Sequence, residues 1–401
     1  MTPPPTPWRT LLPPALADSL VGLRRQLHRF PELSLVEHAT AARLEAALQP
    51  LSPSELARVA GTGVVARIAG RDRGAPVVAV RGDIDALPIT EETGLDFASQ
   101  SPGRMHACGH DVHAAWAVGA AALLAERPAV GDVLIVLQPA EELGRGALAI
   151  LESGVLDGVA AIFGGHVDRR YEVGEVVAQE GALAASCDSF EIELVGAGGH
   201  GARPHEARDP IVGAAAVVLA LQTIVARRLD PTRSGVVTVA RLRGGEALNV
   251  IPDRAALGGT LRARSVADRE QIRDELVRIT TATATAHGLE TEIRFLDGTP
   301  PVVNAAGPVA WARQAVGALA PAPRLVPLAH PILASEDFAF YLEGIPGCFL
   351  RIGAREPGGE YLSAHSPRFY PAEESLFIGA AVLAETARVA SEALAGGSEA
   401  P

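Results

Sequence analysis

The sequence contains no lysine, so all 35 of its basic residues are arginine, against 47 acidic residues. The resulting net charge of −12 argues against nucleic acid or an anionic membrane as a partner, because both attract basic surfaces. The chain also lacks any apolar run of the roughly 18 residues that a membrane span needs. We therefore expect a protein that binds neither nucleic acid nor membrane.

Cysteine is also scarce. The three cysteines, Cys108, Cys187 and Cys348, are too few and too scattered for a disulfide framework. The proline-rich residues 1–7 lack the charged and then apolar pattern of a signal peptide, and we expect them to form a disordered tail. These two observations predict a protein of the reducing cytoplasm.

The first part of the chain alternates helical and strand patterns, which predicts an α/β fold with a mostly parallel sheet covered by helices. The expected helices cover residues 15–29, 36–48, 114–125 and about 145–152. The expected strands cover residues 63–68, 77–80, 133–138 and 160–163.

A different order begins near residue 185 and predicts an inserted domain. Strands at 190–195, 236–242, 255–264 and 290–295 and helices at 210–228 and 266–287 follow the order β-α-β-β-α-β. This order is the ferredoxin-like α+β unit. Later elements resume the first pattern: helices at 307–318 and 372–395, a helix start capped by Ser335, and a strand at 348–352. We predict a catalytic domain formed by residues 1–184 and 298–401, with residues 185–297 inserted.

Residues 103–113 contain the highest concentration of potential metal-binding side chains, with three histidines, a cysteine and an aspartate. Cysteine and histidine are good ligands for borderline-soft divalent metals, which makes Cys108 and His110 candidate ligands on a loop that enters the helix at 114–125. We interpret His106 and His113 as structural. A nucleophilic role for Cys108 fits less well than metal binding, because carboxylates and more histidines follow along the chain.

Three further ligand candidates follow apolar strands or lie in late loops. Glu141 and Glu142 come just after the strand at 133–138, at the sheet edge where α/β proteins keep their active sites. His166 follows the strand at 160–163, and His365 lies in a loop near the C-terminus.

Five candidate ligands exceed the four of a single tetrahedral ion. A bridged pair of ions about 3.5–4 Å apart would use them all and would activate a water molecule. A remaining carboxylate, Glu141, would take the proton of that water as general base. The five candidate ligands are Cys108, His110, Glu142, His166 and His365.

Several blocks resemble the amidohydrolase branch of the di-metal aminoacylase and carboxypeptidase superfamily, which includes hippurate hydrolase and the indole-acetyl-amino-acid hydrolases. The similar blocks span most of the chain in family order, at residues 83–89, 91–95, 105–110, 138–142, 199–200, 249–252 and 335–347. The resemblance implies the same five ligands for two divalent ions, with Glu141 as the base. It also implies that the inserted domain acts as a lid or dimerisation domain.

The resemblance assigns four further residues. Asp83 would orient a ligand, and His200 would stabilise the oxyanion, with a dimer interface as one setting. Asn249 and Arg262 would hold the carboxylate of the substrate, a task that suits the planar guanidinium of arginine.

We therefore expect a cytoplasmic metal-dependent amidohydrolase that cleaves N-acyl-L-amino acids or short peptides and forms a homodimer or homotetramer. Zinc, manganese, cobalt and nickel all remain candidate metals. The alternatives are a metallo-aminopeptidase or carboxypeptidase, and an inactive binding protein on the same fold. The acyl group, the preferred amino acid and the bridging ligand stay open.

Overall fold

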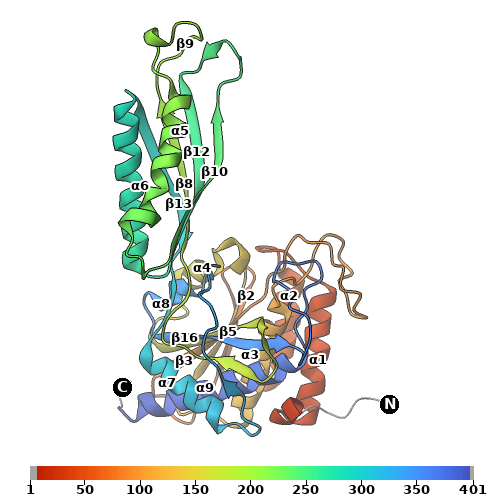
Figure 1. The fold of residues 1–401 in the computed structure, drawn as a ribbon. Helices are drawn as coiled ribbons and strands as arrows, with labels where there is room; N and C mark the ends of the chain where they lie inside the picture. The colour runs from red at the N-terminus through yellow and green to blue at the C-terminus, as the bar shows by residue number, and fades with distance from the viewer. Residues whose placement is uncertain (1–6, 398–401) are drawn as a thin grey trace. The chain divides into compact units, whose positions relative to one another are not determined.

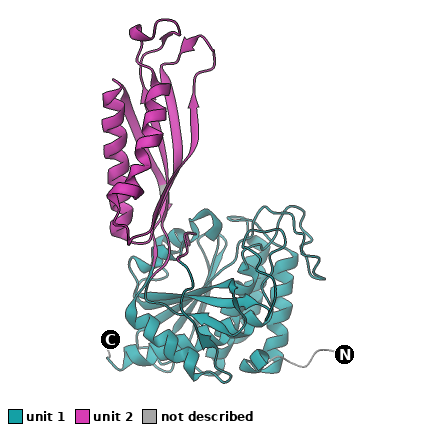
Figure 2. Cartoon of the chain, in the orientation of Figure 1, with its two compact units in different colours: residues 1–181, 303–330, 337–401 teal, residues 182–302, 331–336 magenta. Residues whose placement is uncertain are grey.

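The computed structural model describes residues 7–397, apart from the side chain of residue 297. The predicted tail at residues 1–7 therefore lies almost wholly outside the described residues. The chain divides into two compact units, drawn in different colours in Figure 2. Unit 1 comprises residues 1–181, 303–330 and 337–401, and unit 2 comprises residues 182–302 and 331–336.

Unit 1 is built on a mixed sheet that has, among the described residues, the strand order β1-β2-β4-β3-β5-β16-β6-β15. The central strands β4, β3, β5 and β16 run parallel, whereas β1, β2 and β6 add antiparallel pairings. The prediction of a mostly parallel sheet is thus confirmed for the centre of the sheet. The strands are β1 Glu55–Val59, β2 Gly63–Ile68, β3 Val77–Asp83, β4 Val133–Gln138, β5 Val159–Glu172, β6 Glu175–Val177, β15 Arg324–Leu325 and β16 Gly347–Arg355.

Helices cover this sheet (Figure 1). They are α1 Pro14–Arg29, α2 His38–Leu48, α3 His110–Glu126, α4 Gly146–Glu152, α7 Ala306–Ala318, α8 Ala339–Leu342 and α9 Glu374–Ala395, with short 3₁₀ turns η1 Pro7–Leu11, η2 Gln49–Leu51 and η3 Glu141–Leu143. The helix α3 contacts α1, α9 and β3. Its alanine-rich sequence is buried on nearly every side, as expected for a helix without a polar face. This helix is therefore anchored rigidly at the centre of unit 1.

Three local predictions need correction here, and the first two change where a site residue lies. The helix expected from residue 114 begins at His110, because Gly109 adopts a φ of 90° and turns the chain into the helix. The strand expected at 160–163 continues to Glu172, so His166 lies within a strand and not after it.

Ser335 is the third correction, because it does not cap a helix. The helix α8 begins only at Ala339, after Phe338. The reason lies in Asp337, whose carboxylate accepts hydrogen bonds from Gln138 Nε2 and from the Ala147 backbone N–H. These bonds hold the chain in a loop where the sequence pattern predicted a first helical turn.

Unit 2 contains a four-stranded antiparallel sheet in the order β10-β12-β8-β13. The chain order β8-α5-β10-β12-α6-β13 is the predicted β-α-β-β-α-β pattern. The predicted helix at 210–228 is two elements, α5 and a π-helical turn, η5. The elements are β8 Cys187–Val195, β9 Gly199–His200, η4 Pro204–Glu206, α5 Pro210–Leu221, η5 Ile224–Arg228, β10 Gly235–Gly244, β11 Val250–Ile251, β12 Arg254–Ala263, α6 Val266–Ala286 and β13 Glu290–Thr299.

Two short strands, β7 Gly181–Ala184 and β14 Val302–Asn304, lie where the chain passes from one unit to the other. The role of residues 185–297 as a lid or dimerisation domain remains a prediction. Among the described residues, each helix is too short or too polar to span a lipid bilayer.

The packing of α9 against α3 generates a stability prediction. A Cβ added at Gly379 of α9 would lie 2.1 Å from Cε3 of the buried Trp116. Gly379→Ala should therefore lower the free energy of unfolding by about 1–3 kcal/mol, the usual range for an overpacked core. Denaturant unfolding measures this change.

The matched control is Gly22→Ala in α1, where an added Cβ meets no atom within 4 Å among the described residues. Alanine has the higher helix propensity, so this variant should gain up to about 1 kcal/mol. Equal effects of the two substitutions would contradict the close contact with Trp116.

Candidate metal centre

The five predicted ligands come from four separate segments of unit 1. Cys108 precedes α3, and His110 is its first residue. Glu142 lies in η3, which follows β4 after two residues, and His166 lies in β5. His365 lies in the loop before α9, with a φ of 66°. Buried strands thus carry or precede two of the five candidate ligands, His166 and Glu142.

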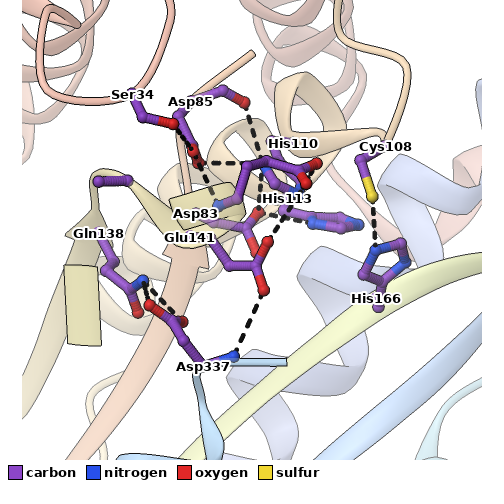
Figure 3. A network of polar contacts seen from close by, with 12 residues as sticks. Ser34, Asp83, Asp85, Cys108, His110, His113, Gln138, Glu141, His166 and Asp337 are labelled. Carbon is purple, nitrogen blue, oxygen red and sulfur yellow. Dashed lines mark hydrogen bonds and ion pairs between the residues drawn. The ribbon is translucent and has the colours of Figure 1, made fainter. Parts of the chain in front are cut away.

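The structure brings all five side chains together (Figure 3 shows Cys108, His110 and His166). Cys108 Sγ lies 3.2 Å from His166 Nε2, and Glu142 Oε1 lies 3.3 Å from His365 Nε2 and 3.9 Å from His110 Nε2. Cys108 links two groups whose potential ligand atoms lie within 4.8 Å of one another: Cys108, His110 and His166, and Cys108, Glu142 and His365.

The hydrogen bonds of two histidines direct their other ring nitrogen into this cluster. His166 Nδ1 lies 2.6 Å from the Val167 carbonyl, and His110 Nδ1 lies 2.9 Å from the Asp85 carbonyl. A carbonyl oxygen only accepts, so each Nδ1 carries the proton. Each Nε2 is therefore the ring nitrogen that the imidazole would offer to a metal ion, the arrangement that metal-binding histidines adopt.

The unpartnered atoms of the cluster fit a bound cation. His110 Nε2 and Glu142 Oε1 are buried and have no hydrogen-bond partner among the described residues. Burial and the neighbouring Glu142 carboxylate hold the pKa of the Cys108 thiol well above its usual range. A divalent ion would coordinate these atoms and favour the thiolate form of Cys108. One sulfur, three imidazoles and one carboxylate suit a borderline ion such as zinc, cobalt or nickel.

Asp85 lies closer to a candidate ligand than Asp83 does. Asp85 Oδ1 lies 3.2 Å from His110 Nδ1, whereas Asp83 Oδ1 lies 3.9 Å from the same atom. Asp83 instead accepts a bond of 2.7 Å from His113 Nδ1. The role of Asp83 in orienting a ligand therefore stays a prediction, and Asp85 is a second candidate for the same role. Both residues belong to one motif and lie two apart, so the sequence offered no signal to separate them.

His113 is held by hydrogen bonds as the sequence predicted, whereas neither ring nitrogen of the buried His106 has a hydrogen-bond partner among the described residues. His113 Nε2 accepts the Val167 N–H at 2.9 Å, so both of its ring nitrogens are engaged. His106 is 1% exposed, and burial lowers its pKa to about 4. Its imidazole is therefore neutral at pH 7.

Glu141 lies beside the ligand cluster. Its Oε2 lies 3.9 Å from His110 Nε2, and its Oε1 accepts the Asp337 backbone N–H at 3.3 Å. Asp337 is itself held by Arg81 Nη2 and Gln138 Nε2, each at 2.9 Å, and Figure 3 shows the contact with Gln138. A half-buried carboxylate thus faces the cluster from a fixed backbone.

The remaining predicted residues belong to unit 2 and occupy different parts of it. His200 in β9 pairs with Val250, and the Asn249 carbonyl accepts the Gly201 N–H at 2.8 Å. These residues lie at one tip of the unit, where Figure 1 labels β9. Arg262 lies near the other end of β12, with Nη1 2.6 Å from the Leu333 carbonyl. His200 and Asn249 therefore lie together, and Arg262 lies apart from them.

Comparison with known proteins adds a family match. Residues 79–389 match the model of peptidase family M20/M25/M40. The chain is 40% identical to an N-acetyl-L-cysteine deacetylase of Bacillus subtilis, over 93% of this chain and 88% of that protein. It is also 40% identical to IAA-amino acid hydrolase ILR1-like 5 of Arabidopsis thaliana, over 92% and 86% of the two chains.

A solved structure supports the same grouping. It is described as a dinuclear metal binding peptidase of the M20 family from Bacillus subtilis. It superposes with a TM-score of 0.84 at 36% identity and covers 95% of this chain and 99% of its own.

The contact between Asp85 and His110 generates a prediction for metal affinity. The carboxylate of Asp85 also accepts the Glu142 N–H at 3.0 Å and the Ser34 hydroxyl at 2.7 Å. Asp85→Asn replaces one accepting oxygen by a donor, so at least one of these groups loses its partner. The affinity for divalent ions should fall about 10–100-fold, as measured by competition with a chelator.

Asp132→Asn serves as the control. Asp132 accepts the Gly70 N–H at 2.9 Å and belongs to none of the candidate ligand groups. An equal loss of affinity in both variants would contradict the role given to Asp85.

Proposed function

The chain belongs to peptidase family M20/M25/M40 and is a metal-dependent amidohydrolase, and from that premise we propose that it hydrolyses N-acyl-L-amino acids. The observation that carries this proposal is the convergence of the five candidate ligands beside a sixth group, Glu141. Cys108, His110, Glu142, His166 and His365 would hold two divalent ions. When bound, such ions lower the pKa of a water molecule and polarise an amide carbonyl.

Glu141 is the group that moves the proton. Its carboxylate takes a proton from the attacking water while the C–O bond forms, and it then delivers that proton to the leaving nitrogen as the C–N bond breaks. The Asp337 N–H at Oε1 stabilises the charged form of Glu141 and fixes its orientation. Glu142 has the other role, because its Oε1 lies nearest to His365 and has no hydrogen-bond partner among the described residues.

Two lines of support favour N-acyl amino acids as substrates. The named relatives are a deacetylase of an N-acetyl amino acid and a hydrolase of IAA-amino acids. In addition, Arg262 and Asn249 offer hydrogen-bond donors suited to a carboxylate. His200, with an imidazole N–H, would stabilise the oxyanion that forms on the amide carbonyl.

These roles require a second copy of the chain. In β12, Arg262 lies eight positions after Arg254, which pairs with Val195 at the β9 end of the sheet. At about 3.3 Å per residue, Arg262 and the pair of His200 and Asn249 lie roughly 25 Å apart. One small substrate cannot contact both ends of a single unit 2, so we infer that His200 and Asn249 act on the substrate of a partner subunit.

The surface of unit 2 is suited to such a partner. The strand β10 is an edge of the sheet and offers unpaired backbone groups for strand addition. Leu219 of the neighbouring α5 is 73% exposed and Leu242 of β10 is 53% exposed, and exposed apolar side chains of this kind commonly mark an interface. A homodimer through β10 and α5 would cover them.

The base assignment predicts the behaviour of Glu141→Gln. The amide keeps the size of the side chain and an oxygen for the Asp337 N–H, but it cannot accept a proton from water. The value of kcat for an N-acetyl amino acid should fall about 10²–10⁴-fold, while elemental analysis still finds the same metal content as in the unaltered protein. Turnover at the original rate would refute the assignment. Comparing a free-amine peptide with its N-acylated form tests the alternative of an aminopeptidase.

The dimer predicts the effect of Leu219→Asp combined with Leu242→Asp. Charged groups on the proposed interface should convert the dimer to a monomer in sedimentation experiments, with loss of turnover because His200 no longer reaches a partner. Val277→Asp on α6, where the side chain is 40% exposed, is the matched control and should leave assembly unchanged. A monomer that retains full activity would contradict the shared site.

A further inference from the structure

Glu37 is a buried carboxylate that the proposed ligand set does not use. It precedes α2 and is 0% exposed. Its Oε1 accepts the Ala140 backbone N–H at 2.9 Å, and its Oε2 accepts the Thr62 hydroxyl at 2.6 Å. Burial raises the pKa of this carboxyl, although the bond from Thr62 opposes the shift. A buried carboxylate is costly unless it is hydrogen-bonded, so the bonds from Ala140 and Thr62 help to retain it there.

The residue that Glu37 contacts has an unusual backbone. Ala140 adopts a φ of 51° and a ψ of 39°, a left-handed conformation that residues with a Cβ rarely adopt. It is fully buried and lies immediately before Glu141. The direction in which the side chain of Glu141 points therefore depends on Ala140 keeping this conformation.

Other bonds hold the same turn at different atoms. The Ala140 carbonyl accepts the Gly146 N–H at 3.2 Å, and Asp85 Oδ2 accepts the Glu142 N–H at 3.0 Å. On the N-terminal side of Glu141, Glu37 accepts the backbone N–H of Ala140. Two buried carboxylates thus bind the backbone on either side of the proposed base.

We propose that Glu37 is a positioning residue, which holds Ala140 in its left-handed conformation and thereby aims the carboxylate of Glu141 at the attacking water. This inference rests on the proposed function, in which Glu141 is the base. The side-chain and backbone groups that Glu37 binds belong to Thr62 and Ala140, and neither residue is a candidate ligand. Glu37 acts only through the backbone of the turn.

The test compares two neutral substitutions of Glu37. Glu37→Met fills the same space but has no acceptor for the Ala140 N–H. Glu37→Gln keeps one acceptor oxygen, and the Thr62 hydroxyl can rotate to accept from its amide. Because both variants remove the charge, their difference reports the loss of the hydrogen bonds to Ala140 and Thr62 and not the loss of the charge, and exchange at the Ala140 amide reports the first bond by itself.

We expect kcat of Glu37→Met to fall by about 10²-fold, the usual effect of displacing a reacting group by about 1 Å. KM and the metal content should remain those of the unaltered protein. Glu37→Gln should retain most of kcat. Hydrogen exchange should be faster at the Ala140 amide in Glu37→Met than in Glu37→Gln, and this readout does not depend on activity.

Glu32→Ala is the matched control, because Glu32 also binds a backbone amide, that of Thr40, at 2.7 Å. Its loss should lower thermal stability and leave kcat unchanged.

Three results would overturn the inference: kcat of Glu37→Met equal to that of the unaltered protein, Glu37→Gln as slow as Glu37→Met, or a loss of metal that accounts for the lost activity. If Glu37→Met does not fold, rapid exchange of the Ala140 amide in the unaltered protein overturns it instead. Failure of the proposed function gives a different result. In that case the unaltered, metal-loaded protein turns over no N-acyl amino acid, at any rate of hydrogen exchange at the Ala140 amide.

Discussion

The structure of unit 1 depends on one electrostatic constraint, the burial of thiol, imidazole and carboxylate groups whose hydrogen-bonding capacity is only partly satisfied among the described residues. Cys108 Sγ and His166 Nε2 lie 3.2 Å apart, and the buried His110 Nε2 and Glu142 Oε1 have no hydrogen-bond partner among the described residues. Burying unpaired polar atoms costs free energy, so the surrounding fold has to hold them in place. The rigid centre formed by α3, β3 and β4 supplies that support.

Hydrogen bonds from surrounding residues hold the side chains of the cluster in place. The Asp85 carboxylate binds both the His110 ring and the Glu142 amide. The Asp337 amide binds Glu141, and the Asp337 carboxylate is held by Arg81 and Gln138. These contacts explain why so many buried charged residues surround the site. A metal centre needs its ligands fixed by a further set of hydrogen bonds, and here that set is made largely of carboxylates that accept backbone or imidazole N–H groups.

Much of this arrangement could be predicted from the sequence. Long apolar runs such as residues 133–138 fix the buried strands, and the carboxylates that follow them then lie at the edge where sites form. The five ligand candidates were recognisable because cysteine and histidine are good ligands for divalent metals and because the blocks around them resemble a di-metal family. The order β-α-β-β-α-β was equally readable, since strand and helix periodicities differ.

What the sequence could not predict depends on side-chain direction and on local backbone conformation. Asp83 and Asp85 carry the same side chain two positions apart, and only the end of β3 decides which one meets His110. Ser335 has the composition of a helix cap, but the buried bonds of Asp337 prevent a helix there. The left-handed Ala140 has no signal at all, because alanine carries no mark of a positive φ.

The most direct test of the account is the position of bound metal in crystals of the full chain soaked with zinc or manganese. Anomalous diffraction should locate two peaks about 3.5–4 Å apart, contacted by Cys108, His110, Glu142, His166 and His365, with Glu141 beside them and outside the coordination shell. A single peak, or metal bound away from Cys108 and His166, would contradict the account.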